Sequence, residues 1–289
     1  MKRMIEERND RIYINSSSID LIQSCRKKAF FALERNLRGT EQSDALVFGS
    51  ALHKALEAFY SAPIFGNERA ITVSQVQDVF EKNANGLAEL PDSEKRSVAN
   101  GKKIISNYIA TYKNDPWVVV VDSHGPVVER SFELESPVPG VTIHGQIDCL
   151  LQNVETKEIV VCDHKTSSSL GADFLNRVKP NIQFSIYTWA ANQLGFKVDQ
   201  VMVNGIQVAK TKADLLRVFT KRDQNDFDEM FETINDSVVL WKQAKASKIW
   251  PMNSSSCGQW GGCQYKEICS FSRDTRESAI QQIYQGLSG

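Results

Sequence analysis

Two stretches of sequence, VTIHGQIDCLL at residues 141–151 and IVVCDHK at residues 159–165, decide the fold. Both are rich in β-branched residues and partly alternate between apolar and polar side chains, which predicts two strands. The polar stretch between them predicts the turn of an antiparallel hairpin. Because successive side chains of a strand point to opposite faces, Asp163 and Lys165 share one face, about 6.6 Å apart, and Asp148 can lie across from them.

The sequence on either side of this hairpin predicts helices and further strands. Helical spacing and capping residues predict helices over 19–33, 45–60, 73–90, 93–112, 180–194 and 223–245. Alternating β-branched runs predict strands over 127–134, 201–208 and 215–220. The predicted fold class is α/β, with a central mixed β-sheet flanked by helices, an N-terminal helical region and a C-terminal segment that carries cysteines.

Composition and charge exclude some classes of protein. The chain has 289 residues, of which 42% are hydrophobic and 24% charged, and no apolar run approaches the length of a membrane span. The opening sequence MKRMIEERND has no apolar signal-peptide core behind it. We therefore expect a cytoplasmic protein with no membrane partner. The net charge of −1 gives no overall electrostatic argument for nucleic acid, although short basic clusters are present.

The side chains of the predicted hairpin suit metal-ion chemistry. Asp148 and Asp163 can converge on a hard divalent cation such as Mg²⁺ or Mn²⁺, with the backbone carbonyl of His164 as a further ligand. Such a cation polarises a phosphate and activates water, and Lys165 beside it stabilises negative charge. A plain salt bridge at the strand end between Asp163 and Lys165 is the simpler alternative for so short a motif.

Four short motifs, in this order, resemble those of the RecB-like branch of the PD-(D/E)xK nuclease superfamily. The G-x-x-D motif corresponds to Gly145–Asp148, the D-x-K motif to Asp163–Lys165, and the Q-x-x-x-Y helix motif to Gln183–Tyr187. Gly49–His53 resembles the helix that brings a histidine to the metal. The opening Ser17–Phe31 resembles the start of iron–sulfur members, which include CRISPR-associated adaptation nucleases and the nuclease domain of AddB.

The resemblance implies a restriction-endonuclease-like core and a role for each motif. It makes His53 a metal ligand beside the two aspartates, although a lone helical histidine is more often structural. Gln183 and Tyr187 lie four residues apart on one helix face, so both can contact Lys165 or a DNA phosphate. Tyr187 is equally well explained as a core aromatic residue.

Three further acidic residues on the predicted strand over 127–134 and just beyond it remain ambiguous. Glu129 can act as a supporting carboxylate near the metal, but Glu133 and Glu135 compete for that role. All three are also explained by an exposed strand face.

Six cysteines without an export signal argue against a disulfide framework. The resemblance implies a [4Fe–4S] cluster held by one early and three late cysteines, here Cys25, Cys257, Cys263 and Cys269. The late cysteines are spaced C-x₅-C-x₅-C, whereas the iron–sulfur relatives have C-x₂-C-x₅-C. A structural Zn²⁺ site is the second interpretation and free thiols the third.

The two remaining cysteines flank the aspartates in sequence. Cys149 and Cys162 are each adjacent to an aspartate of the predicted site, so strand alternation turns them to the opposite face. We interpret both as small core residues.

The resemblance implies a metal-dependent DNA exonuclease that favours single-stranded ends and acts in recombination, repair or spacer acquisition. The alternative is a subunit with a nuclease fold that binds DNA and acts only within a larger complex, with helicase, recombination or CRISPR-adaptation partners. The chain has no Walker A motif, so we expect no motor activity of its own. The expected organisation is a single nuclease domain over 1–289, with a helical region (1–115), a catalytic sheet core (116–222) and a C-terminal helix and cluster-binding segment (223–289).

Overall fold

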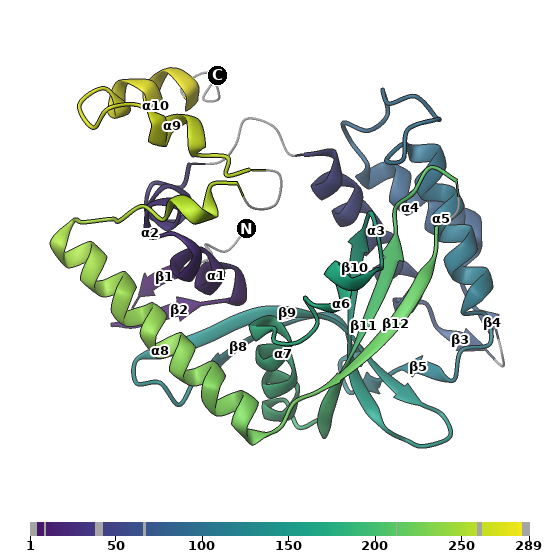
Figure 1. Ribbon diagram of the computed structural model, residues 1–289. Coiled ribbons are helices and arrows are strands. Elements are labelled where there is room, and N and C mark those ends of the chain that lie inside the picture. The colour runs from purple at the N-terminus through teal and green to yellow at the C-terminus, as the bar shows by residue number, and fades with distance from the viewer. Residues whose placement is uncertain are drawn as a thin grey trace. The chain divides into compact units, whose positions relative to one another are not determined.

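The structure is a computed structural model that describes residues 5–8, 10–37, 43–65, 68–211, 213–258 and 262–284. Its internal contacts divide the chain into two compact units (Figure 1). The first unit comprises Met1–Gln42, Glu133–His144 and Asp228–Gly289, and the second comprises Ser43–Phe132 and Gly145–Phe227. Among the described residues, no helix is both long enough and apolar enough to span a membrane.

The second unit is built around four strands in the order β9-β10-β11-β12. β9 (Val141–Asn153) contributes its part from Gly145 onward and pairs antiparallel with β10 (Ile159–Ser167). β10 pairs parallel with β11 (Val198–Gln207), which pairs antiparallel with β12 (Leu215–Lys221). The prediction of a mixed sheet is confirmed, and the parallel pair requires the helical crossover between β10 and β11.

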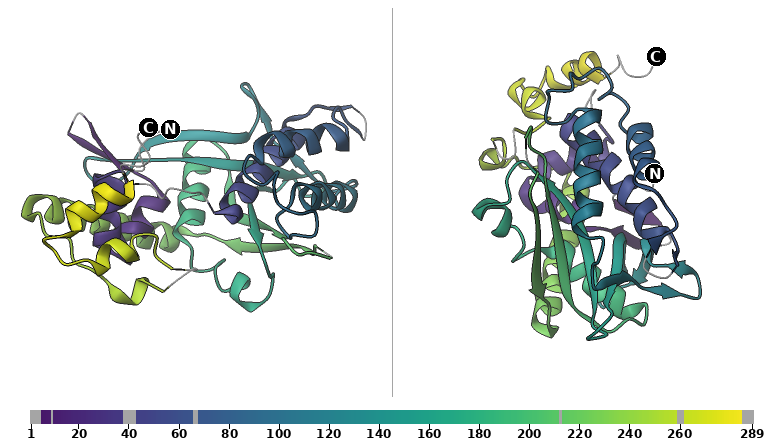
Figure 2. Two further views of the ribbon diagram at one scale, coloured as in Figure 1. Left: turned by 90° about the horizontal axis from the view of Figure 1, so that it is seen from above. Right: turned by 90° about the vertical axis from the view of Figure 1, so that its right-hand side faces the viewer.

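The helices of the second unit cover both faces of these strands. The helices are α3 (Asp44–Ser61), α4 (Val73–Asn83), α5 (Val98–Thr111), α6 (Ala172–Leu175) and α7 (Ile182–Gln193). Side chains of α3, α4 and α5 form one buried core with Cys149, Cys162 and Met202, so these helices cover that face, as Figure 2 shows. α7 packs against β10 and β11 from the face that carries Asp163 and Lys165.

The remaining elements of the second unit are short strands. They are β3 (Ile64–Phe65), β4 (Glu68–Arg69), β5 (Trp117–Val119), β6 (Val121–Asp122), β7 (Gly125–Pro126) and β8 (Val128–Glu135, whose residues from Glu133 onward belong to the first unit). β5 and β8 both pair with β9, so they extend the sheet beside it.

The first unit contains two strands, several helices and the ends of elements that continue into the second unit. The strands β1 (Ile5–Arg8) and β2 (Arg11–Ile14) form a hairpin, and β2 runs parallel to the first residues of β9. The helical segments are α1 (Ser16–Ser24), α2 (Arg26–Ala29), η1 (Phe30–Glu34), α8 (Gln224–Ser247), η2 (Ser254–Ser256), α9 (Lys266–Ser270) and α10 (Arg276–Tyr284). Asn15 caps α1 through a hydrogen bond from Ser18 N, which explains why this helix starts after the asparagine.

The sequence predicted every long element but missed the N-terminal hairpin. The expected helical region over 1–115 in fact opens with β1 and β2, whose four-residue strands are too short for a clear alternation. The helix predicted over 73–90 ends at Asn83, and the helix predicted from 93 begins at Val98, after the Ser97 cap. The expectation of a single domain over 1–289 stays a prediction.

Candidate active site

The predicted site lies where β9 and β10 stop pairing. Their ladder of backbone pairs ends at Cys162–Cys149. Beyond this pair, the side chain of Asp148, the neighbour of Cys149 in β9, takes the place of a backbone acceptor: its Oδ2 accepts a hydrogen bond from His164 N at 2.9 Å. β10 remains paired with β11 to its end. A buried amide that loses its strand partner needs another acceptor, so Asp148 replaces the missing ladder bond.

Lys165 is held by a chain of hydrogen bonds that runs to α7. Its Nζ donates to Asp163 Oδ1 at 2.9 Å, lies 2.7 Å from Asp163 Oδ2, and donates to Gln183 Oε1 at 3.1 Å. Gln183 Nε2 in turn donates to Tyr187 Oη at 2.9 Å. Gln183 and Tyr187 therefore lie on the same face of α7, as their spacing indicates. Tyr187 holds the amide of Gln183, and this amide accepts from the lysine.

His53 reaches the same place from α3. Its Nε2 donates to the carbonyl of His164 at 2.8 Å, and its Nδ1 lies 3.4 Å from Asp148 Oδ2. Hydrogen bonding of one ring nitrogen to a backbone carbonyl leaves the other available, which is the arrangement that metal-ligating histidines adopt. The carbonyl oxygen of His164 keeps a second lone pair after accepting this bond.

Glu129 completes the acidic side of the site, and it is the residue that sequence reasoning did not single out. One ligand atom each from His53, Glu129 and Asp148 lie within 4.8 Å of one another. Glu129 has φ 45°, a left-handed conformation that is uncommon for a glutamate, and Gln146 Nε2 donates to its carbonyl at 2.9 Å. This irregularity in β8 distinguishes Glu129 from Glu133 and Glu135, and strand alternation alone could not reveal it.

The charges of the site are strongly perturbed by burial. Asp163 has an exposed side-chain fraction of 1%, and burial, assisted by the negative charge of Asp148, raises its pKa to about 6 although Lys165 opposes the shift. Burial and Asp148 likewise raise the pKa of Glu129 to about 7. Burial alone would lower the pKa of Lys165, but the carboxylates of Asp163 and Asp148 raise it above its usual value, so the lysine is a stable cation.

Two glycines of the motifs allow close packing around the site. A Cβ at Gly145 would lie 2.6 Å from Phe132 Cζ, so only glycine accommodates that ring against β9. Phe132 also meets Tyr187 edge to face, with ring centroids 6.2 Å apart. A Cβ at Gly49 would lie 3.3 Å from Thr166 Oγ1, so this glycine lets α3 approach β10 closely enough for His53 to reach the site.

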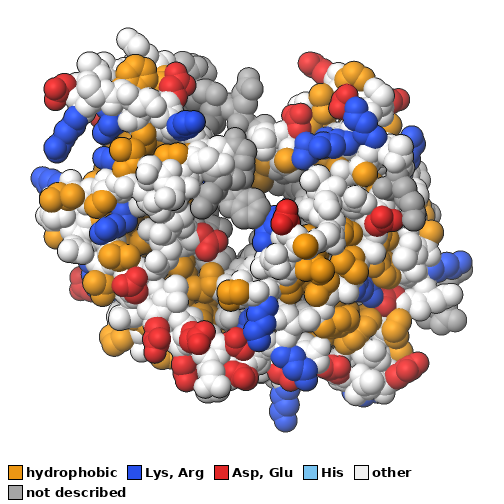
Figure 3. Space-filling view, in the orientation of Figure 1, with side chains coloured by type: hydrophobic (Ala, Val, Ile, Leu, Met, Phe, Trp, Pro, Cys, Tyr) orange, Lys and Arg blue, Asp and Glu red, His pale blue; other side chains and the backbone are white. Residues whose placement is uncertain are grey.

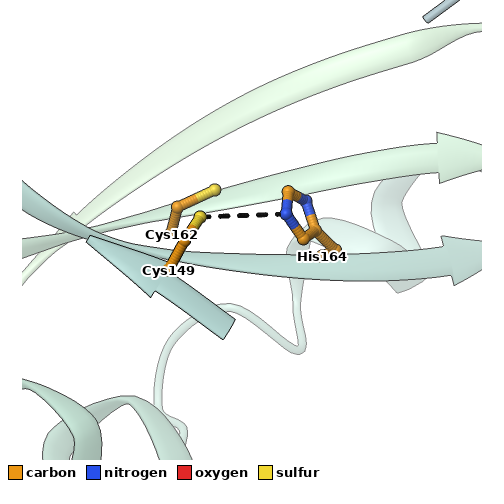
Figure 4. A group of neighbouring side chains, drawn as sticks. All are labelled: Cys149, Cys162 and His164. Atoms are coloured by element: carbon orange, nitrogen blue, oxygen red, sulfur yellow. Dashed lines mark hydrogen bonds between the residues drawn. The ribbon is translucent and has the colours of Figure 1, made fainter. Parts of the chain in front are cut away.

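The side chain of His164 faces away from this site, into the core under α3 and α5. It lies near Cys149 and Cys162, as Figure 4 shows, and both sulfurs are fully buried, as expected for core residues. Burial lowers the pKa of His164 to about 3, so its ring is neutral.

The donor set fits a hard divalent cation. Two carboxylates, one imidazole nitrogen and a backbone carbonyl are ligand types that Mg²⁺ or Mn²⁺ accepts. The third carboxylate, that of Asp163, is close enough for the charges of Asp148 and His53 to act on its pKa. The raised pKa values of Glu129 and Asp163 reflect excess buried negative charge, which a cation would neutralise.

The four terminal cysteines all lie in the first unit, and none forms a disulfide. Cys25 is buried and accepts a hydrogen bond from Asn253 N at 3.4 Å, and Cys263 N donates to the carbonyl of Cys257 at 3.0 Å. Burial raises the pKa of the Cys269 thiol, and the other three cysteines act on it in the same direction. In the described part of the chain, no three of these sulfurs lie within 4.8 Å of one another.

Comparison with known proteins identifies the family of the chain and a similar fold. The sequence profile of the PD-(D/E)XK nuclease superfamily matches residues 13–270. A crystal structure from Eubacterium rectale described as a "putative exonuclease" is similar in fold, with TM-score 0.54 and 15% identity over 89% of this chain and 89% of that chain.

A crystal structure of SSO0001 gives TM-score 0.36 and 17% identity over 78% of this chain and 96% of that chain. The sequence matches none of the curated proteins with which it was compared. The family profile spans both units and every motif of the site, and the chain therefore belongs to the PD-(D/E)XK nuclease superfamily.

Proposed function

We propose that this protein is a Mg²⁺- or Mn²⁺-dependent DNA exonuclease of the RecB-like type that favours single-stranded ends. The observation that carries the proposal is a pair of contact sets at one place: His53 lies against Asp148, and Lys165 joins Asp163 to Gln183. A plain strand-end salt bridge explains the pair Asp163–Lys165, but it does not explain why a histidine and two further carboxylates gather beside it.

In phosphodiester hydrolysis, one group of residues would bind the metal ion and Lys165 would contact the phosphate. His53, Asp148, Asp163 and the His164 carbonyl, together with Glu129, would hold the cation. When bound, that cation would polarise the scissile phosphate and favour deprotonation of the attacking water.

Lys165 acts on the phosphate itself. The side chain of Lys165 remains 37% exposed while its ammonium is fixed by Asp163 and Gln183, so it is positioned to meet a phosphate from solvent. A fixed positive charge stabilises the negative charge that develops on the phosphoryl oxygens, and it needs no reorganisation during the reaction.

The distribution of charge supports a substrate with a free end rather than broad binding along a duplex. The net charge is −1, and basic and acidic side chains are interspersed on the face shown in Figure 3. Proteins that bind long stretches of duplex rely on many Lys and Arg contacts with phosphate. The preference for single-stranded ends rests on the resemblance of the four motifs to the RecB-like nucleases.

The test compares wild type with Lys165→Met on end-labelled single-stranded, double-stranded and circular DNA, with Mg²⁺, with Mn²⁺ and with EDTA. Lys157→Met, which changes an exposed lysine of the β9–β10 turn, is the matched control. We expect metal-dependent shortening of linear single strands by wild type and by Lys157→Met, and a loss of at least about 100-fold in Lys165→Met. The product ladder gives the polarity of cleavage.

Cleavage of circular DNA would replace the exonuclease assignment with an endonuclease one. No cleavage of any substrate by folded protein that binds Mn²⁺ would support the alternative, in which the chain acts only within a larger complex. Addition of candidate helicase or recombination partners then tests that alternative directly.

We further propose that Cys25, Cys257, Cys263 and Cys269 hold a [4Fe–4S] cluster with a structural role. Cys25, Cys257 and Cys263 are close enough to Cys269 to raise the pKa of its thiol, which supports a common site for the four sulfurs. The choice of a cluster over zinc rests on the family resemblance, which implies one early and three late cysteine ligands. Protein purified without oxygen should be brown and contain about four irons per chain, and Cys25→Ser should lose both. A colourless, iron-free protein that contains zinc would support the zinc interpretation instead.

A further inference from the structure

A second group of metal-ligating side chains lies in the core of the second unit, on the sheet face opposite Asp163 and Lys165. Ligand atoms of Cys149, Cys162 and His164 lie within 4.8 Å of one another, with His164 Nε2 3.9 Å from Cys149 Sγ (Figure 4). The three residues have exposed fractions of 0%, 0% and 4%. The two cysteines are direct partners in the β9–β10 ladder, so the sheet itself fixes their sulfurs side by side.

The surroundings of His164 prepare its ring for ligation. Asn204 lies 3.0 Å from His164 Nδ1 through its amide nitrogen, which also contacts Tyr108 Oη. Within the described part of the chain, the fully buried Asn204 Oδ1 has no hydrogen-bond partner. A half-turn of the amide lets this oxygen accept from His164 Nδ1–H and from the hydroxyl of Tyr108. His164 Nε2 then carries a lone pair directed at the sulfurs, and the ring is held as metal-ligating histidines are.

We propose that Cys149, Cys162 and His164 form a binding site for a thiophilic divalent cation of the zinc class, separate from the oxygen-rich catalytic site. Two thiolates and one imidazole are a zinc ligand set, and they leave one position of the tetrahedron open. The ion displaces the two thiol protons to solvent, so the dication with two thiolates is neutral overall. Neutrality matters in this core, because an unpaired charge there would be costly.

This core ion site would act on catalysis through the backbone. Each ligand is a sequence neighbour of a residue of the active site: Cys149 follows Asp148, Cys162 precedes Asp163, and His164 lies between Asp163 and Lys165. The carbonyl of His164 also accepts the hydrogen bond of His53. An ion in the core would therefore hold β9 and β10 together at the point where their ladder ends, on the sheet face opposite the active site. Its occupancy would regulate how rigidly Asp148 and Asp163 are held.

The test uses Co²⁺, whose bonds to thiolates give a strong near-ultraviolet absorption that carboxylate ligands do not give. In the background protein all four terminal cysteines are replaced by serine (C25S, C257S, C263S and C269S), so that they contribute no thiolate signal. Because the three ligands are buried, the protein is unfolded and refolded with one equivalent of Co²⁺ rather than titrated in its native state. Cys162→Ala and Cys149→Ala in this background remove the proposed ligands. Asp148→Asn is the matched control, because it removes one charge from the oxygen-rich site but keeps an oxygen that can accept from His164 N.

We expect one Co²⁺ per chain with thiolate charge-transfer and tetrahedral visible bands, displaced by Zn²⁺. Both bands should disappear in Cys162→Ala and Cys149→Ala and persist in Asp148→Asn. The proposal is overturned if the refolded background protein shows no thiolate absorption, or if the bands survive loss of either cysteine. If a cysteine variant fails to refold by circular dichroism, native mass spectrometry of the background protein decides: retention of one zinc per chain against EDTA supports the site, and a metal-free mass refutes it.

Discussion

A methyl group added at Gly145 should damage activity more than stability. In Gly145→Ala the new Cβ would meet Phe132 Cζ at 2.6 Å and Phe132 Cε1 at 2.9 Å, so the ring has to move by roughly 1 Å to reach ordinary contact distance. Overpacking of this kind costs about 1–3 kcal/mol, against a gain of about 0.5–1 kcal/mol from replacing glycine within a strand. We therefore expect a net loss of roughly 0–2.5 kcal/mol, or a Tm lower by at most about 10 °C.

The effect on activity follows from what Phe132 touches. Its ring packs edge to face on Tyr187, Tyr187 accepts from Gln183, and Gln183 accepts from Lys165. If the displacement of the Phe132 ring moves Tyr187, Gln183 and then Lys165 by about 1 Å, kcat should fall by about 10- to 100-fold. Thermal unfolding and the single-strand cleavage assay measure the two effects on the same preparation.

Two further variants decide whether the clash is the cause. Gly171→Ala is the matched control, because this exposed glycine would place its Cβ 3.4 Å from Ser169 Oγ, an ordinary contact, and should change stability by less than about 0.5 kcal/mol. In a Phe132→Ala background the ring is gone, so Gly145→Ala should cost little beyond the Phe132 substitution itself. If Gly145→Ala costs as much in that background as in wild type, the steric reasoning is wrong.

Three other predictions follow from the same structure. In EDTA, the free energy of unfolding should fall as the pH rises from about 4 to about 7. The raised pKa values of Asp163 and Glu129 make the folded state bind more protons than the unfolded state in this range, and Asp163 contributes about 3 kcal/mol at most. Thermal melts of wild type and Asp163→Asn across this range check it, and an equal pH slope in both would contradict it. Arg217→Leu should lose about 3–5 kcal/mol in urea unfolding, because it leaves the largely buried Asp115 carboxylate without its bidentate partner, whereas removal of both groups should cost less than removal of the arginine alone. Tyr187→Phe should leave Tm within about 2 °C but lower kcat about 10-fold, since only the orientation of the amide that holds the lysine changes; an unchanged kcat would argue against that role.

The sequence was most informative where a regular pattern spans a long element. Residues 141–151 and 159–165 are rich in β-branched residues and partly alternate, so β9 and β10, their antiparallel pairing and the opposite orientation of Cys149 could all be predicted. The first hairpin could not, because IEERNDRIYI mixes charged and apolar residues over strands of four residues.

The site illustrates the same limit. Spacing along one helix placed Gln183 and Tyr187 on one face, and their hydrogen bond agrees with this. Glu129 could not be separated from Glu133 by alternation, because a local backbone irregularity distinguishes them, and a left-handed glutamate has no sequence pattern of its own. His164 illustrates the reverse case: the prediction used only its backbone carbonyl, whereas the side chain belongs to a buried network with Asn204.

The unequal pairing of β10 has a consequence for how the proposed catalytic residues are held in position. β10 leaves β9 at Cys162 but stays in register with β11 for every residue up to Ser167, which pairs with Gln207. β11 is therefore the template against which the D-x-K segment is aligned. A slip of one residue along that template would turn His164 toward α7 and bury Lys165 among the tyrosines of the core. The sheet would stay intact, but the proposed catalytic side chains would no longer share the face of α7.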